Sequence, residues 1–114
     1  MSRAFSVPPI INLQRDKLVP YRLEGYTAEN RCQWLPVSYN ADTQCGSYYF
    51  QLLPGAVTVP HVHPGYEEFY VLEGECEWQV GDRLVRAKPG TYLFIPPGVP
   101  HNIGNASDRP ARML

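Results

Sequence analysis

Turn-forming residues interrupt this chain so often that no helix of ordinary length fits into its second half. The 114 residues include twelve prolines and nine glycines, which favour turns over the interiors of helices and strands. Between the turns lie short segments rich in aromatic and β-branched residues, a pattern typical of β-strands. We expect strands at SYYFQLL, VTVPHVH, EEFYVLE, ECEWQV, RLVR, TYLFI and PHNIG.

One hairpin can be aligned residue by residue from its turn, the Gly-Asp pair at residues 81–82. A two-residue connection sets the register of the strands on either side, so Trp78 is predicted to face Val85 and Glu77 to face Arg86. One face is then apolar and the other is charged and solvated. Short antiparallel strands with one apolar face close into a barrel or pack as a sandwich. The predicted fold class is therefore all-β, as a small jelly-roll barrel.

The length of the chain corresponds to one domain. Residues 1–45 mix short apolar pieces with prolines, and we expect an N-terminal extended arm plus two short strands, followed by a barrel core at residues 46–114. The chain stops at RPARML, where a further strand would begin, so the arm or a partner subunit would have to cover the edge unless the chain is shortened. Uncovered strand edges pair readily, and we therefore expect a homodimer.

The charge pattern excludes several classes of partner. Ten basic and eleven acidic residues give a net charge of −1 without any basic run, so neither nucleic acid nor a membrane surface is an expected partner. No apolar run approaches the roughly 20 residues that span a bilayer. The first residues also lack the apolar core of a signal peptide, and we expect a cytoplasmic protein.

The three cysteines, Cys32, Cys45 and Cys76, are odd in number and form no Cys-x-x-Cys pair. A disulfide framework and a cysteine zinc site are therefore not indicated. We expect free thiols, with a disulfide between Cys32 and Cys45 as the alternative.

Two histidines separated by one residue indicate a metal site. Side chains two residues apart on a strand share a face, so His61 and His63 bring their rings together. A Pro-Gly turn at residues 64–65 places Glu67 beside them, and a barrel would bring in the third histidine, His101. The alternative is that the His-x-His pair arose by chance as exposed or buried structural residues. We favour a shared cation because an acid and the one remaining histidine both follow turns.

Two longer motifs in the same region resemble those of the cupin superfamily. The first is Gly-x5-His-x-His-x3-Glu-x6-Gly and the second is Gly-x5-Pro-x-Gly-x2-His-x3-Asn. The matching residues are Gly55, His61, His63, Glu67 and Gly74 in the first motif, and Gly90, Pro96, Gly98, His101 and Asn105 in the second. The resemblance covers about half of the chain. It implies a cupin-type double-stranded β-helix, in which His61, His63, Glu67 and His101 hold a divalent metal ion.

The neighbouring acid Glu68 competes with Glu67 for this role. The alternating residues that follow are apolar on both faces of the strand, so periodicity does not separate the two acids. Only the spacing to Gly74 favours Glu67.

Three imidazoles and one carboxylate suit iron, manganese, nickel, cobalt, copper or zinc. An octahedral ion would keep two positions open, whereas a tetrahedral zinc would be closed. The resemblance implies a quercetin-dioxygenase-like enzyme that acts on a small aromatic or dicarbonyl compound. A non-catalytic binding or sensing cupin and a sugar isomerase or epimerase are the alternatives. We expect an apolar small-molecule pocket lined by Tyr49, Gln51, Phe69, Trp78 and Tyr92.

Overall fold

The computed structural model describes residues 18–20 and 31–114, and this part of the chain contains nine β-strands and no helix. The strands are β1 (Val19–Pro20), β2 (Cys32–Asn40), β3 (Cys45–Leu52), β4 (Glu67–Glu73), β5 (Cys76–Val80), β6 (Arg83–Ala87), β7 (Tyr92–Ile95), β8 (His101–Gly104) and β9 (Ala111–Met113). The predicted all-β fold is confirmed, and the described residues include no helix that could cross a membrane.

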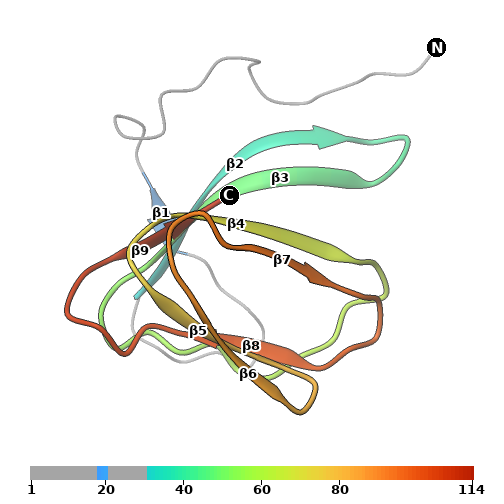
Figure 1. Ribbon diagram of the computed structural model, residues 1–114. Coiled ribbons are helices and arrows are strands. Elements are labelled where there is room, and N and C mark those ends of the chain that lie inside the picture. The colour runs from blue at the N-terminus through green and yellow to red at the C-terminus, as the bar shows by residue number, and fades with distance from the viewer. Residues whose placement is uncertain (1–17, 21–30) are drawn as a thin grey trace.

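Two antiparallel sheets face each other to form the barrel (Figure 1). The larger sheet has the order β1-β2-β3-β9-β4-β7, and the smaller has the order β6-β5-β8. Six of the expected strand segments correspond to β3 and to β4 through β8. The segment VTVPHVH is the exception, because it forms only two isolated bridges to the smaller sheet.

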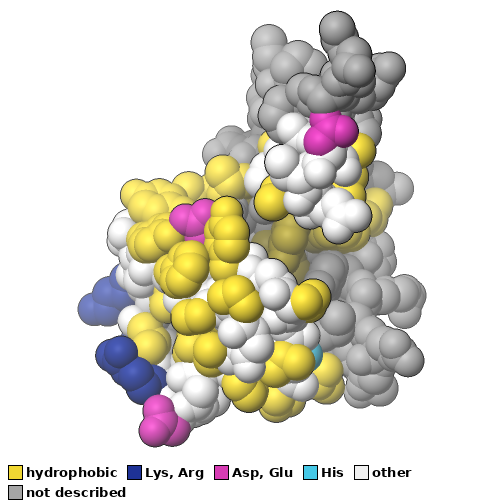
Figure 2. All heavy atoms as spheres, turned by 90° about the vertical axis from the view of Figure 1, so that its right-hand side faces the viewer, with side chains coloured by type: hydrophobic (Ala, Val, Ile, Leu, Met, Phe, Trp, Pro, Cys, Tyr) yellow, Lys and Arg dark blue, Asp and Glu magenta, His cyan; other side chains and the backbone are white. Residues whose placement is uncertain are grey.

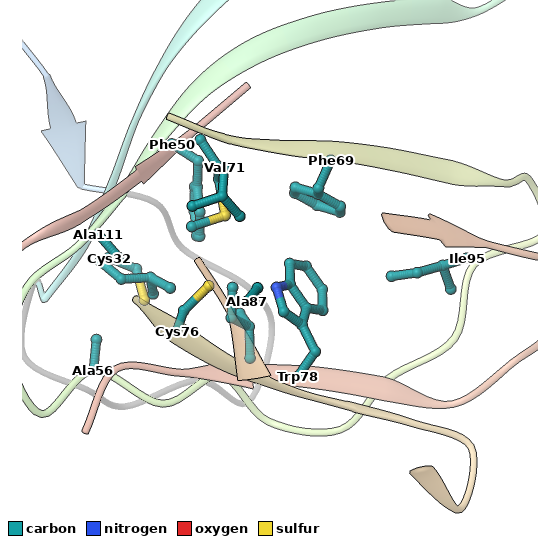
Figure 3. Close-up of a cluster of buried hydrophobic side chains, with 13 residues drawn as sticks. Cys32, Phe50, Ala56, Phe69, Val71, Cys76, Trp78, Ala87, Ile95 and Ala111 are labelled. Atoms are coloured by element: carbon teal, nitrogen blue, oxygen red, sulfur yellow. The ribbon is translucent and has the colours of Figure 1, made fainter. Parts of the chain in front are cut away.

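The hydrophobic core fills the space between the sheets. Phe50, Phe69 and Val71 enter from the larger sheet and Trp78 from the smaller one, and all four are buried. Figure 3 shows the side chains of Phe69 and Trp78 next to each other. Their ring centroids are 4.5 Å apart and the planes are tilted by 52°. Removing an apolar side chain of this size from water stabilises a fold by about 1.5–3 kcal/mol. These contacts bind the two sheets to each other.

The hairpin of β5 and β6 has the predicted register. Trp78 pairs with Val85 and Glu77 pairs with Arg86. Trp78 lies in the core, whereas the Arg86 guanidinium lies 3.1 Å from the Glu77 carboxylate on the outside. Exposed ion pairs of this kind contribute at most about 1 kcal/mol. This outer face is structural.

The expected boundary at residue 45 falls inside a hairpin. β2 pairs with β3 from Cys32 opposite Leu52 to Asn40 opposite Cys45, and the register shifts between Pro36 and Ser38. Proline has no amide hydrogen for the ladder, so a bulge is where a strand tolerates it. Two strands of the expected arm region are therefore part of the larger sheet, and the end of the β2–β3 hairpin extends beyond the barrel (Figure 1). The rest of that region, residues 1–17 and 21–30, lies outside the described residues.

The last strand, β9, lies between β3 and β4 and pairs with both. The edge that we expected to be uncovered is thus filled by the chain's own RPARML segment, and that argument for a dimer is wrong. The homodimer stays a prediction. Gly74 allows the residue after β4 to lie close to the start of β9. Its φ is +73°, and a Cβ at this position would collide with the backbone of Pro110 and Ala111.

No disulfide joins Cys32, Cys45 or Cys76, as predicted. Cys32 is buried and pairs with Leu52, whereas Cys45 is exposed and pairs with Asn40. They lie at opposite ends of the β2–β3 hairpin, which explains why they do not form a disulfide.

Candidate metal centre

The site forms where the segment before β4 meets the start of β8. His61 and His101 form an isolated antiparallel bridge, in which each amide nitrogen lies 3.0 Å from the other residue's carbonyl oxygen. His63 follows two residues later, and its carbonyl accepts a hydrogen bond from the amide of Gly98, in the turn before β8. Glu67 is the first residue of β4. Both sheets therefore contribute to the site.

All four predicted residues converge. His61, His63, Glu67 and His101 each offer one potential ligand atom, and these atoms lie within 4.8 Å of one another. Glu67 Oε1 is 2.8 Å from His101 Nε2 and 3.3 Å from His63 Nε2. The ring centroids of His61 and His101 are 4.4 Å apart. Three imidazoles and a carboxylate thus surround one small volume.

Backbone carbonyl groups fix the tautomers of two of the rings. His61 Nδ1 lies 2.7 Å from the Val59 carbonyl oxygen, and His101 Nδ1 lies 2.9 Å from that of Val99. A carbonyl oxygen only accepts hydrogen bonds, so Nδ1 carries the hydrogen in both rings. In the neutral rings Nε2 then keeps its lone pair for a cation, an arrangement found around metal-bound histidines.

The Nε2 atom of His101 provides a direct test of whether the site suits a cation. It is buried and makes no well-aligned hydrogen bond, although the Glu67 carboxylate is 2.8 Å away. A lone pair and a carboxylate oxygen repel each other unless a proton or a metal ion lies between them. The donor set and its geometry therefore fit a bound cation.

The pKa values of two histidines shift in opposite directions. Burial lowers the pKa of His63, and the other two rings add to this effect against the opposing Glu67 carboxylate. Burial also acts to lower the pKa of His101, but Glu67 and the Val99 carbonyl outweigh it and the pKa is raised. The Glu67 carboxylate thus favours positive charge most strongly at the buried His101 ring.

The structure places Glu67, not Glu68, with the histidines. Glu68 lies on the outer face of β4, where its carboxylate accepts a hydrogen bond from the Tyr92 hydroxyl and thereby raises the pKa of Tyr92. After Glu68 the buried and exposed residues alternate along β4, with Phe69 inside and Tyr70 outside. Both faces are apolar in sequence, so only their burial distinguishes them.

A small cavity of about 20 Å³ adjoins the histidines on the core side. This is close to the volume that one water molecule occupies. The residues that line it are Tyr48, Phe50, Thr58, His61, Glu67, Phe69, Trp78, His101 and Ile103.

Residues 48–114 match the family model described as Cupin domain. The chain belongs to the cupin family. The match runs from within β3 to the end of the chain and includes β4 to β9. Cupin domains commonly bind a transition-metal ion, for which this cupin has the cluster of His61, His63, Glu67 and His101.

Three similar proteins illustrate the range of the family. Tetracenomycin polyketide synthase protein TcmJ of Streptomyces glaucescens is 31% identical over 67 residues, which are 58% of this cupin and 45% of TcmJ. The protein TT1209 from Thermus thermophilus is 31% identical, with a TM-score of 0.67 and coverage of 94% of this chain and 93% of that one. The polyketide cyclase RemF from Streptomyces resistomycificus shares the fold, with a TM-score of 0.77 at 23% identity and coverage of 94% and 76%. This cupin spans about half the length of the curated relatives that it matches.

Two of the five expected pocket residues, Phe69 and Trp78, line the small cavity of this cupin. Gln51 points to the opposite face of β3, where it donates a hydrogen bond to Gln33 and accepts one from Arg112. Tyr49 shares that face, because side chains alternate along a strand. Tyr92 is exposed on the outer face of β7.

The inward residues of β3 that sequence reasoning missed are Tyr48 and Phe50. Their rings make an edge contact with centroids 5.9 Å apart. The run SYYFQLL is apolar at consecutive positions, so its pattern does not indicate which of the two alternating sets of side chains faces inward.

Proposed function

We propose that this cupin binds one divalent transition-metal ion through His61, His63, Glu67 and His101, and acts on a small aromatic or dicarbonyl compound. The observation that carries the proposal is the buried Nε2 of His101, which faces the Glu67 carboxylate without a well-aligned hydrogen bond. An ion site accounts best for this cluster of three rings, because backbone carbonyls set the tautomers of two of them, His61 and His101.

The donor set and the surroundings support this assignment. Three imidazoles and one carboxylate are ligands that iron, manganese, nickel, cobalt, copper and zinc accept. When bound, such an ion supplies a Lewis acid for paired oxygens such as those of an enol or a diketone. The carbonyls of Val59 and Val99 orient the rings of His61 and His101. Phe69 and Trp78 form an apolar wall of the cavity on the core side.

Dioxygenation is the reaction that we propose for the site. Both atoms of dioxygen would enter the organic substrate, so no external reductant is needed. The test is metal analysis of protein purified without added ions, followed by oxygen-electrode measurements on adding a flavonol or a β-diketone. We expect about one redox-active ion per chain and oxygen uptake that matches substrate loss. Stoichiometric zinc without oxygen uptake would instead support a non-catalytic binding protein.

A ring-closing reaction is the second candidate, and the similarity to TcmJ favours it. That relative is named as a polyketide synthase protein and is 31% identical over 67 residues. Cyclisation would use the same cluster to hold a β-diketone in its enol form, would consume no dioxygen, and would release one water per aromatic ring formed. Oxygen uptake together with product mass therefore distinguishes the two reactions.

A further inference from the structure

A second and much larger cavity, of about 750 Å³, opens beside Glu67. One wall is the end of the β2–β3 hairpin at residues 43–48, and the opposite wall is the segment at residues 64–69. We call this cavity the hairpin cleft. Figure 2 shows the recess between the projecting hairpin and the body of the barrel.

The hairpin cleft adjoins the metal site. Tyr48, Glu67 and Phe69 line both the cleft and the small cavity beside the histidines. A molecule in the cleft would therefore have one end at the Glu67 carboxylate and the rest against the hairpin. The volume lies within the range of roughly 300–1,000 Å³ that is typical of small-molecule sites, and it is far larger than a simple dicarboxylate requires.

The charge of the cleft restricts what it accepts. Its described lining includes the acidic residues Glu67 and Glu68 but no lysine, arginine or histidine. A phosphate, sulfonate or carboxylate would lose water there without a described cationic side chain to compensate, and would lie near the like charge of Glu67. The cleft therefore disfavours anionic groups.

Aromatic side chains give the cleft its apolar surface. Tyr48, Tyr66 and Phe69 all line it. The ring of Tyr66 stacks on Phe94 with centroids 5.5 Å apart and an angle of 26° between the planes, which supports the ring from outside. Aromatic pairs with this kind of separation attract each other beyond simple burial. Gln44, at the hairpin end, adds a neutral amide that can bond hydroxyl or keto groups.

We infer that the hairpin cleft binds the uncharged, planar, hydroxylated aromatic portion of a substrate whose oxygens reach the histidine cluster. The contact between the substrate oxygens and the histidine cluster rests on the proposed function, whereas binding of the ring in the cleft needs no metal ion. The cleft thus selects neutral polycyclic phenols over sugar phosphates and small dicarboxylates.

The first test compares two probes with one ring system, quinizarin and quinizarin-2-sulfonate. Each is titrated into the full chain after dialysis against EDTA, at a pH where the phenols stay protonated, and binding is followed by absorbance. We expect the sulfonate to bind at least about tenfold more weakly than quinizarin, because it places a second negative charge near Glu67 without a described cationic side chain to compensate. Equal or tighter binding of the sulfonate would overturn the inference.

Matched variants locate the binding. Tyr66→Ala removes a ring that lines the cleft, and should weaken quinizarin binding by about threefold to tenfold. Tyr70→Ala removes another exposed tyrosine, on the outer face of β4 and outside the cleft lining, and should leave binding unchanged. Equal losses in the two variants would place the ring elsewhere.

A charge variant tests selectivity. Gln44→Lys exchanges one unbranched side chain for another at a residue with φ of 58°, and should strengthen sulfonate binding by about fivefold or more in low salt. Leu84→Lys adds the same charge on the exposed face of β6, outside the cleft, and should not. Identical effects of the two lysines would contradict the inference.

Titration with Co²⁺, followed by its visible absorption, separates this inference from the proposed function. If Co²⁺ binds the cluster while quinizarin does not bind the metal-free chain, the cleft inference fails and the metal site stands. If quinizarin binds with the expected selectivity while Co²⁺ does not bind, the cleft inference stands and the proposed function fails.

Discussion

The backbones of His61 and His101 are hydrogen-bonded to each other in both directions, with each nitrogen-to-oxygen distance 3.0 Å. The two residues come from segments 40 positions apart in the chain, and this bridge brings their side chains to one place. Because the bridge uses backbone atoms alone, a change of side chain leaves it intact. Substitutions at these positions can therefore test ion binding separately from folding.

His101→Ala is expected to abolish stoichiometric metal binding while the barrel stays folded. Losing a residue that merely supports a metal ligand costs about 10–100-fold in affinity, so losing a ligand should cost at least the upper end of this range. Metal content by mass spectrometry and circular dichroism check the two parts. The control is Asn102→Ala, which removes a neighbouring side chain that donates to the Thr58 carbonyl outside the cluster. Unchanged metal content in His101→Ala would remove this residue from the site.

Glu67→Gln and Glu68→Gln form a matched pair that differs only in which face of β4 changes. Glu67→Gln should weaken metal binding, because it removes the charge 2.8 Å from His101 Nε2. Glu68→Gln should keep the metal and lower the pKa of Tyr92, since the carboxylate that raises it is lost. Calorimetric metal titration and an ultraviolet titration of the tyrosines measure these effects. Weaker binding in Glu68→Gln alone would reverse the assignment of the two acids.

Gly74→Ala should destabilise the fold by more than about 1–3 kcal/mol, the usual cost of an unfavourable backbone conformation. Its φ is +73°, and the added methyl group would also meet the backbone of Pro110 and Ala111 next to β9. Urea unfolding measures the change. Gly65→Ala is the control, because its Cβ meets nothing within 4 Å. Similar stability of the two variants would argue against the close packing of β9.

The pH dependence of thiol alkylation should differ between Cys45 and Cys76. Cys45 is exposed, whereas burial raises the pKa of Cys76 to about 11. The reactive species is the thiolate, so labelling of the native protein at pH of about 8 should occur at Cys45, and labelling of Cys76 should require pH values approaching 11. Peptide mass mapping identifies the sites, and urea should make every thiol reactive. Fast labelling of Cys76 at the lower pH would show that this core opens readily.

The site was largely predictable because spacing in sequence determines spacing in the fold, although only the motif spacing to Gly74 favoured Glu67 over Glu68. The register of the β5–β6 hairpin was predictable for the same reason, since a two-residue turn leaves one main way to pair the strands. Both predictions depended on distances along the chain that the backbone converts directly into geometry.

Other features depended on contacts that the local sequence does not encode. Tyr48 and Tyr49 are identical side chains on opposite faces of β3, and only the closed barrel decides which one faces inward. β9 has three residues and exists because β3 and β4 lie on either side of it. Pro36 is one of the prolines that interrupt residues 1–45, and the register shift next to it in β2 accommodates it within the strand.

The cluster has one further consequence, because Glu67 belongs to the larger sheet and His101 to the smaller one. An ion held by both would be a cross-link between the two halves of the barrel, present only when the protein is folded. Metal binding and folding would then be thermodynamically linked. The free energy of unfolding would rise by about 2.7 kcal/mol when the free ion concentration reaches about 100 times the dissociation constant. The melting temperature of this small barrel would thus report how much metal its surroundings offer.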